Sequence, residues 1–412
     1  MLIAFDGFPF KAGGVCAAKG FAANGVHCGL RKASDAPDLA MVYSETPCAA
    51  AGVYTTNKVK GAPIAVTKAH IADGKVRAVI VNSGNANTCN IDGEEKAEMM
   101  CALAADALGI DANDVAVAST GVIGEILPIE PIAACVKPLA EGLSVTGNEQ
   151  AARAIMTTDT VKKEVALSFM LGDKEITVGG MAKGSGMIHP NMATMLCFLT
   201  TDAAIAQPLL QMALSAVTKD TFNMVSVDGD TSTNDTVLLM ASGKAGNAPI
   251  EDIESAAYQT FVNALYIVLM NLSRMIAKDG EGASKLLECT VTGADDEQTA
   301  KIVAKSVITS SLFKCAMFGK DPNWGRILCA VGYAQAELDP DSVAVTLSST
   351  GGSVCVCENG RGVPIDKAAA AAVLEPDEIK ILISLGKGSE RAVAWGCDLT
   401  YDYVKINADY HT

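Results

Sequence analysis

The chain has 412 residues, of which 50% are hydrophobic and 19% are charged. This composition is typical of a packed globular protein and excludes a disordered one, and the length suffices for two or three domains. The formal net charge of −15 disfavours nucleic acids and anionic membrane surfaces as partners, because both would repel an acidic protein.

Cysteine usage and the start of the chain point to a cytoplasmic protein. The 13 cysteines are scattered and form no CxxC pair, so we expect most of them to be buried thiols in a reducing compartment. Cys355 and Cys357 alone do not make a zinc site, and we expect neither a metal nor a cofactor. The first ten residues lack the basic region of a signal peptide, and no uncharged apolar run approaches the ~20 residues of a membrane span.

Strand-like and helix-like hydrophobic periods alternate along the chain. In chain order they predict a strand at 76–81, a helix at 94–108, a strand at 115–118, helices at 132–142 and 149–156, strands at 164–171 and 194–200, a helix at 207–219, a strand at 236–240, a helix at 252–277, and strands at 343–347 and 379–385. The helix at 252–277 has an apolar stripe at helical spacing, which predicts a core helix. Turn residues cluster at 247–249 and 293–297, and the faster succession of elements after residue 300 indicates a separate α+β lobe.

The segment 183–196 contains an unusual combination of residues. A glycine-rich turn, a proline and the Ala193-Thr194 bond directly precede an apolar run at 195–199. A threonine released by a break at this bond would carry a hydroxyl nucleophile and a free α-amino group on the same residue, and it would need no separate histidine base. The alternative is a loop that leads into a buried strand. His189 either assists such a break or has a hydrogen-bonded structural role.

Three polar clusters each have a structural and a functional interpretation. Ser119-Thr120-Gly121 is either an ordinary turn or a group of donors that stabilises an oxyanion. The segment 278–282 closes the long predicted helix, either as a cap in which Gly280 ends the helix or with Glu281 pairing with a substrate ammonium. Asp228, Asp230 and the Asn234-Asp235 pair lack the spacing of a calcium loop and favour a turn with local backbone bonds. No phosphate loop, dinucleotide fingerprint or GxSxG elbow occurs.

Taken together, the motifs closely resemble the bifunctional arginine biosynthesis family, the glutamate N-acetyltransferases that are also called ornithine acetyltransferases. The resemblance extends over essentially the whole chain. It is carried, in the family's order, by the segments 81–87 (VNSGNAN), 119–124 (STGVIG), 155–160 (IMTTDT), 180–196 (GMAKGSGMIHPNMATML), 278–282 (KDGEG), 321–326 (DPNWGR) and 403–412.

The resemblance implies self-cleavage between Ala193 and Thr194, which gives an α chain of residues 1–193 and a β chain of residues 194–412. Within the β chain, about 194–290 would complete the catalytic core and 291–412 would form the smaller C-terminal lobe. Thr194 would be the nucleophile, and Thr120 with the Gly121 N–H would stabilise the oxyanion. The implied substrate contacts are Thr157, Lys183, Thr194, Glu281, Asn407 and Thr412, with Thr158 left open in place of Thr157.

The implied reaction transfers acetyl from N2-acetylornithine to Thr194 and then to glutamate, with acetyl-CoA left open as a further donor. Lys183 would pair with a substrate carboxylate, and Glu281 with the ornithine cation. The implied fold is α+β, with layers of helix, sheet and helix like those of N-terminal-nucleophile aminopeptidases, and the implied assembly is a dimer of αβ units. Two alternatives stay open: a self-processing amidase or aminopeptidase of the same fold, and a non-catalytic binding protein whose Ala193-Thr194 bond stays intact.

Overall fold

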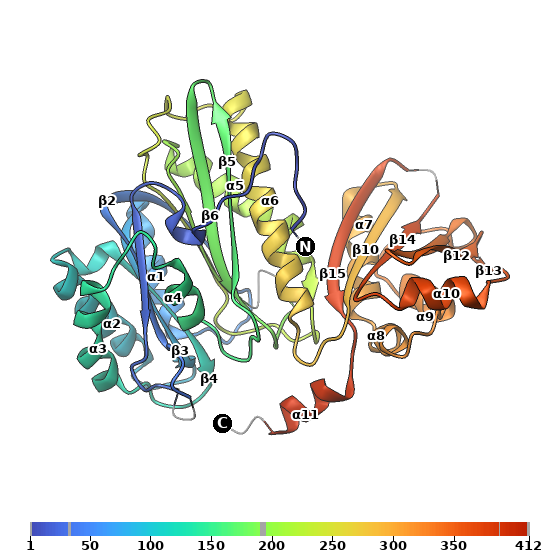
Figure 1. Ribbon diagram of the computed structural model, residues 1–412, viewed down its shortest axis with the longest axis horizontal. Helices are drawn as coiled ribbons and strands as arrows, with labels where there is room; N and C mark the ends of the chain where they lie inside the picture. The colour runs from blue at the N-terminus through green and yellow to red at the C-terminus, as the bar shows by residue number, and fades with distance from the viewer. Residues whose placement is uncertain (1, 32–33, 190–194, 387, 410–412) are drawn as a thin grey trace.

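Two mixed β-sheets lie side by side in the computed structural model, which describes residues 2–31, 34–189, 195–386 and 388–409 (Figure 1). The larger sheet has eight strands in the described part of the chain, in the order β4-β3-β2-β9-β7-β6-β5, with β1 paired to β2 off that path. Its strands are β1 (Phe21–Val26), β2 (Leu39–Tyr54), β3 (Lys75–Asn85), β4 (Val115–Val122), β5 (Lys163–Leu171), β6 (Lys174–Lys183), β7 (Leu196–Thr201) and β9 (Thr236–Ala241).

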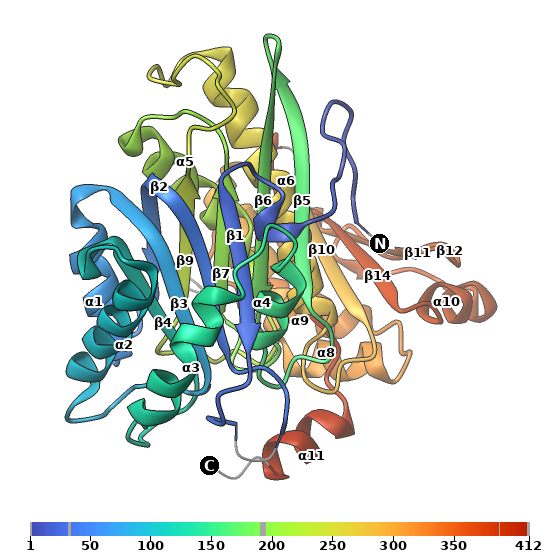
Figure 2. The same ribbon diagram turned by 60° about the vertical axis from the view of Figure 1, so that its left-hand side comes forward.

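Helices cover both faces of this sheet. Helix α4 packs on β1 and β2 at one face, where Figure 2 shows it in front of the strands. Helices α1, α2 and α3 group together over β2–β4, and α5 and α6 pack at the β2, β5 and β6 strands. The bounds are α1 (Ala62–His70), α2 (Gly93–Leu108), α3 (Ile129–Glu141), α4 (Asn148–Ala154), α5 (Gln207–Asp220) and α6 (Ala256–Lys278). Strands β7 and β9 are buried at every position, as expected for the middle of a covered sheet.

The smaller sheet has seven strands in the described residues, in the order β13-β12-β11-β14-β10-β15-β8. They are β8 (Val225–Ser226), β10 (Leu286–Ala294), β11 (Ala344–Ser349), β12 (Gly352–Glu358), β13 (Arg361–Gly362), β14 (Glu378–Ser384) and β15 (Glu390–Cys397). The accompanying helices are α7 (Glu297–Thr309), α8 (Ser311–Phe318), α9 (Trp324–Gly332), α10 (Lys367–Leu374) and α11 (Tyr401–Asp409). Short 3-10 turns are η1 (Gly14–Cys16), η2 (Ile71–Asp73), η3 (Ala112–Asp114), η4 (Phe222–Met224) and η5 (Pro340–Ser342).

Helix α6 joins the two sheets into one core. It packs on β5 and β6 of the larger sheet and on β8, β10 and β15 of the smaller one, which explains why it is long and apolar enough to pass for a membrane span. The core helix predicted at 252–277 is therefore confirmed, but it begins four residues later. Ser255 caps it, since its hydroxyl accepts a hydrogen bond from the Tyr258 N–H at 3.1 Å.

The α+β class and the predicted elements agree with the structure, with two corrections. The strand predicted to end at residue 118 continues to Val122, so Ser119-Thr120-Gly121 lies in β4 and forms no turn. The cap predicted at Gly280 is also corrected, because helix α6 ends at Lys278 with Asp279 as its C-cap and the glycine with a left-handed backbone is Gly282, with φ of 66°. The predicted cleavage residues Ala193 and Thr194 and the terminal Thr412 lie outside the described residues, so the division into chains of 1–193 and 194–412 stays a prediction.

Candidate active site

A cavity opens where the ends of β4 and β6 lie beside the starts of β7 and β9. It encloses about 800 Å³ of empty space, part of it open to solvent. Its walls come from segments that are far apart in the sequence, including the end of α11. The lining residues are Ala86, Thr120, Gly121, Ile123, Thr157, Thr158, Lys183, Gly186, Met187, Met195, Leu196, Ser232, Thr233, Asn234, Asp235, Glu281 and Asn407.

Thr120 and Gly121 face this cavity from the end of β4. Gly121 pairs in register with Gly84 of β3, and its φ of 132° lies in a region that side chains rarely adopt. A Cβ at Gly121 would lie 2.3 Å from the Gly84 carbonyl carbon. Glycine is therefore required here both by the backbone conformation and by the close approach of the two strands, which fixes the Gly121 N–H in place.

Asn234 ties the segment before β9 to the segments that carry Thr120. It is 7% exposed, and its amide donates to the carbonyls of Ala86 at 2.5 Å and Ser119 at 2.9 Å. Its Oδ1 accepts from the hydroxyls of Thr88 at 2.6 Å and Thr233 at 2.5 Å. The sequence predicted only a local turn at Asn234, because three of the four partners of this amide, Ala86, Thr88 and Ser119, lie more than 100 residues away.

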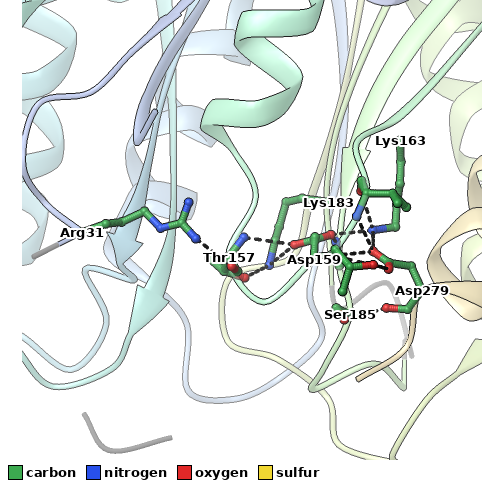
Figure 3. Close-up of polar contacts among 10 residues, drawn as sticks. Arg31, Thr157, Asp159, Lys163, Lys183, Ser185 and Asp279 are labelled. Atoms are coloured by element: carbon green, nitrogen blue, oxygen red, sulfur yellow. Dashed lines mark hydrogen bonds and ion pairs between the residues drawn. The ribbon is translucent and has the colours of Figure 1, made fainter. Parts of the chain in front are cut away.

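Lys183 enters the cavity from the last position of β6. Its Nζ donates to Thr157 Oγ1 at 2.6 Å and lies 3.8 Å from Asp159 Oδ2 (Figure 3). Burial lowers the pKa of Lys183, and the charge of Asp159 opposes this shift. Burial alone would raise the pKa of Asp159, but the ammonium groups of Lys183 and Lys163 outweigh it and hold that pKa below its usual range.

Glu281 lies in the turn that follows α6. Its N–H donates to the Ser185 carbonyl at 2.9 Å, and its Oε2 accepts from Asn407 Nδ2 at 2.8 Å. A Cβ at Gly186 would lie 2.3 Å from the Glu281 carboxyl carbon, so the carboxylate lies directly over Gly186. The predicted substrate contact Glu281 and the C-terminal helix α11 thus meet at this cavity.

Asp228 holds the backbone of the segment that precedes the predicted cleavage bond. Its carboxylate accepts from the N–H groups of Met187 at 2.6 Å and Ile188 at 2.9 Å, besides the local bond from Asp230 N–H at 3.2 Å. Burial raises the pKa of Asp228, while these N–H groups oppose the shift. The predicted local turn is correct as far as Asp230, but the sequence offered no signal for the bonds to Met187 and Ile188.

His189 has hydrogen-bonded neighbours on both its ring and its backbone. Its Nδ1 lies 3.2 Å from Ser226 Oγ, and its carbonyl accepts from Thr231 Oγ1 at 2.8 Å. Burial, and secondarily the charge of Lys305, lowers the pKa of His189 to about 4, so the ring is neutral at physiological pH. This geometry agrees with the hydrogen-bonded structural role among the two interpretations from the sequence.

The structure brings six of the predicted site residues to one cavity: Thr120, Gly121, Thr157, Lys183, Glu281 and Asn407. Thr158 lines it as well, so the alternative to Thr157 stays open. Met195, the first described residue after the predicted bond, lies in the same wall.

Among the residues that the structure describes, no group of three His, Cys, Asp or Glu side chains is placed to hold a metal ion. An ammonium and a carboxylate that face one cavity suit a ligand with both charges.

The family model and the sequence relatives agree on one family. The family model "ArgJ family" matches residues 22–412. The arginine biosynthesis bifunctional protein ArgJ 1 of Clostridium acetobutylicum is 50% identical over 95% of this chain and 96% of its own. The arginine biosynthesis bifunctional protein ArgJ of Symbiobacterium thermophilum is 49% identical over 97% of this chain and 99% of its own. A crystal structure of the arginine biosynthesis bifunctional protein argJ from Bacillus halodurans is 45% identical and covers 52% of this chain and 98% of its own, with a TM-score of 0.49.

Proposed function

The chain belongs to the ArgJ family, and we propose that it transfers an acetyl group from N2-acetylornithine to glutamate through an acetyl ester on Thr194. The observation that carries this proposal is the convergence of six residues on one cavity, although the sequence places them between residues 120 and 407. We would expect these six residues to meet at one cavity only if the motifs that resemble this family form a single site. Met195, which follows Thr194 in the sequence and is the first described residue after it, lines the same cavity, and this supports the proposal.

The first step is self-cleavage. The Thr194 hydroxyl attacks the Ala193 carbonyl, the new C–O bond replaces the C–N bond, and the hydroxyl proton is transferred to the departing nitrogen. Water then hydrolyses the ester, which frees the Ala193 carboxylate and the Thr194 hydroxyl beside the Thr194 amine that the first attack released. A free α-amino group has an ordinary pKa of about 7.7–8.0, which suits a general base near neutral pH.

The second stage is a ping-pong transfer. The Thr194 amine takes the hydroxyl proton while the oxygen attacks the acetyl carbonyl of N2-acetylornithine, and ornithine leaves with its amine protonated. The glutamate amine then attacks the acetyl ester, releasing the Thr194 hydroxyl and N-acetylglutamate. Thr120 and the Gly121 N–H stabilise the oxyanion in both half-reactions of this transfer, for which their fixed position at the cavity is suited.

The charges in the cavity fit the proposed substrates. The Lys183 ammonium, already oriented by Thr157 and Asp159, pairs with the α-carboxylate that both substrates carry. The Glu281 carboxylate, oriented by Asn407, pairs with the side-chain ammonium of ornithine. Thr412, which lies outside the described residues, completes the proposed contacts.

We also propose a cytoplasmic location, an assembly of two αβ units, and acetyl-CoA as an open second donor.

The deciding assay follows isotope-labelled glutamate in the presence of N2-acetylornithine and the purified protein. Formation of labelled N-acetylglutamate supports the proposed transfer, whereas release of acetate without it favours the amidase or aminopeptidase alternative. A parallel reaction with acetyl-CoA in place of N2-acetylornithine tests the second donor.

Lys183→Met is expected to weaken the use of both substrates, whereas Glu281→Gln affects N2-acetylornithine more than glutamate. Equal effects of Glu281→Gln on the two substrates would contradict the assignment of Glu281.

A further inference from the structure

Lys163, at the start of β5, is a buried cation outside the predicted site. Its side chain is 0% exposed, and its Nζ lies 2.7 Å from Asp159 Oδ1 and 2.5 Å from Asp279 Oδ2 (Figure 3). The two carboxylates belong to different parts of the chain, one before β5 and one at the end of α6. Lys163 therefore bridges two segments, and each of them leads to one of the charged residues of the cavity.

Asp159 forms the first half of the bridge. Besides Lys163, its carboxylate accepts from the N–H groups of Thr157 at 3.0 Å and Gly184 at 2.7 Å, and it lies 3.8 Å from Lys183 Nζ. Asp159 therefore fixes the backbone at Thr157 and at Gly184, which lie on the two sides of the hydrogen bond between the side chains of Lys183 and Thr157. Asp159 itself is fully buried as a side chain, so water does not compete for these contacts.

Asp279 forms the second half. Its carboxylate accepts from the Thr160 hydroxyl and from the Thr160 N–H at 3.1 Å, while its carbonyl accepts from Ser185 Oγ at 2.6 Å. Glu281 follows two residues later, and its N–H donates to the Ser185 carbonyl at 2.9 Å. The position of Asp279 thus sets the position of the turn that presents Glu281.

Charge explains why the two halves depend on Lys163. Without its ammonium, Asp159 would keep only the Lys183 ammonium at 3.8 Å, and Asp279 would be a second carboxylate beside it with little access to solvent, so the two would repel each other. At least one of them would move or take up a proton, and the backbone that it holds would lose its anchor.

We propose that Lys163 is a positioning residue that holds Lys183 and Glu281 in a fixed relation, so that both ends of a doubly charged substrate are recognised together. The substrate part of this inference rests on the proposed function. A merely structural ion pair would stabilise the fold but would not couple the two recognition residues. The two roles therefore predict different results for variants that still fold.

The test compares Lys163→Met with Lys162→Met in the full-length protein. Lys162 is the adjacent, partly exposed lysine that pairs with Glu149 at 3.2 Å and Glu164 at 2.9 Å. For Lys163→Met we expect kcat/KM for N2-acetylornithine to fall about 10- to 100-fold, as for a small displacement of substrate-positioning groups. Hydrogen exchange at the Gly184 and Glu281 amides should become faster in the same variant. Lys162→Met should leave all three readouts within about twofold of the wild type.

A double-mutant cycle with Lys183→Met and Glu281→Gln separates coupling from stability. In the wild-type background, the fold-reduction in kcat/KM of the double variant should differ from the product of the reductions of Lys183→Met and Glu281→Gln alone. In the Lys163→Met background it should equal that product. If Lys163→Met does not fold, Asp279→Asn, which keeps the shape but loses the charge, replaces it in every arm.

The inference is overturned if hydrogen exchange rises at only one of the Gly184 and Glu281 amides. It is also overturned if the coupling between Lys183→Met and Glu281→Gln is the same in both backgrounds. A wild-type protein without acetyl transfer would overturn the proposed function instead, and the exchange measurement would still decide the positioning role of Lys163.

Discussion

Asn407 donates a hydrogen bond from its side-chain amide to Glu281 Oε2 at 2.8 Å, which joins residues 126 positions apart in the sequence. Its Nδ2 also donates to the Tyr403 carbonyl at 3.0 Å, so the amide is oriented by its own helix. Through this contact α11, which follows the last strand of the smaller sheet (Figure 1), contributes to a cavity that is also lined by the ends of β4 and β6 and the start of β7 in the larger sheet.

Asn407→Ala should raise KM for N2-acetylornithine and leave the stability of the protein nearly unchanged. The lost bond involves a charged acceptor but is exposed, so we expect an effect of about 1 kcal/mol, or roughly fivefold in KM. Steady-state kinetics measure it, with Lys405→Ala on an exposed position of the same helix as the control. A rise in KM of equal size in both variants would show that α11 acts through its packing and not through Asn407.

Gly121→Ala should both destabilise the protein and abolish acetyl transfer. The added methyl group combines an unfavourable φ with a clash against Gly84, for which we expect a loss of about 2–4 kcal/mol in the free energy of unfolding. Gly124→Ala is the matched control, because Gly124 has a φ of 86° but nothing within 4 Å of an added Cβ. Urea unfolding should give a loss of only about 1 kcal/mol there. Equal losses for the two variants would argue against the close approach of β3 and β4.

Asn234→Ala should leave the carbonyls of Ala86 and Ser119 without their donor. We expect a destabilisation of about 2–4 kcal/mol, because buried polar groups lose their partners, together with a large fall in kcat. Asn247→Ala removes another buried amide, which bonds the Ala204 backbone away from the cavity. It should cost similar stability and leave kcat unchanged. A fall in kcat for Asn247→Ala would mean that kcat follows stability and not the position of β4.

The stability of the protein should depend on the protonation of His189. Its folded pKa of about 4 lies below the ordinary value of 6.5, so the folded state resists protonation of the ring. The corresponding stability is present above pH 6.5 and is lost as the pH falls through 4, with a size of about 1–3 kcal/mol. His189→Gln should therefore lose less stability than the wild type between pH 6.5 and 4, as measured by urea unfolding at each pH. Identical slopes for the wild type and His189→Gln would contradict the buried, neutral ring.

Local patterns in the sequence predicted part of the elements, among them neither β2 nor β6, and they did not predict the contacts that arrange the site. The apolar stripe of α6 and the apolar run of β9 depend on neighbouring residues and were readable. The bonds of Asn234 to Ser119 and of Asp279 to Thr160 join residues 115 and 119 positions apart, and they exist only once the sheets have formed. Lys163 carried no signal at all, since a lysine at the start of a predicted strand is ordinarily exposed.

The site residues themselves were recognisable because the motifs resemble those of a known family. Composition and periodicity left Thr120 and Glu281 with ordinary structural interpretations. The cavity brings these two residues together with Lys183 and Asn407, a convergence that no local pattern contains.

Intact-protein mass measurement after brief incubation with N2-acetylornithine tests the role of Thr194 most directly. For the wild type we predict two chains, of residues 1–193 and 194–412, with one acetyl group on Thr194 of the second chain that glutamate removes. For Thr194→Ala we predict a single chain of 42.5 kDa without an acetyl group. A wild-type protein that stays in one piece, or an acetyl group that appears equally on the Thr194→Ala protein, would contradict the account.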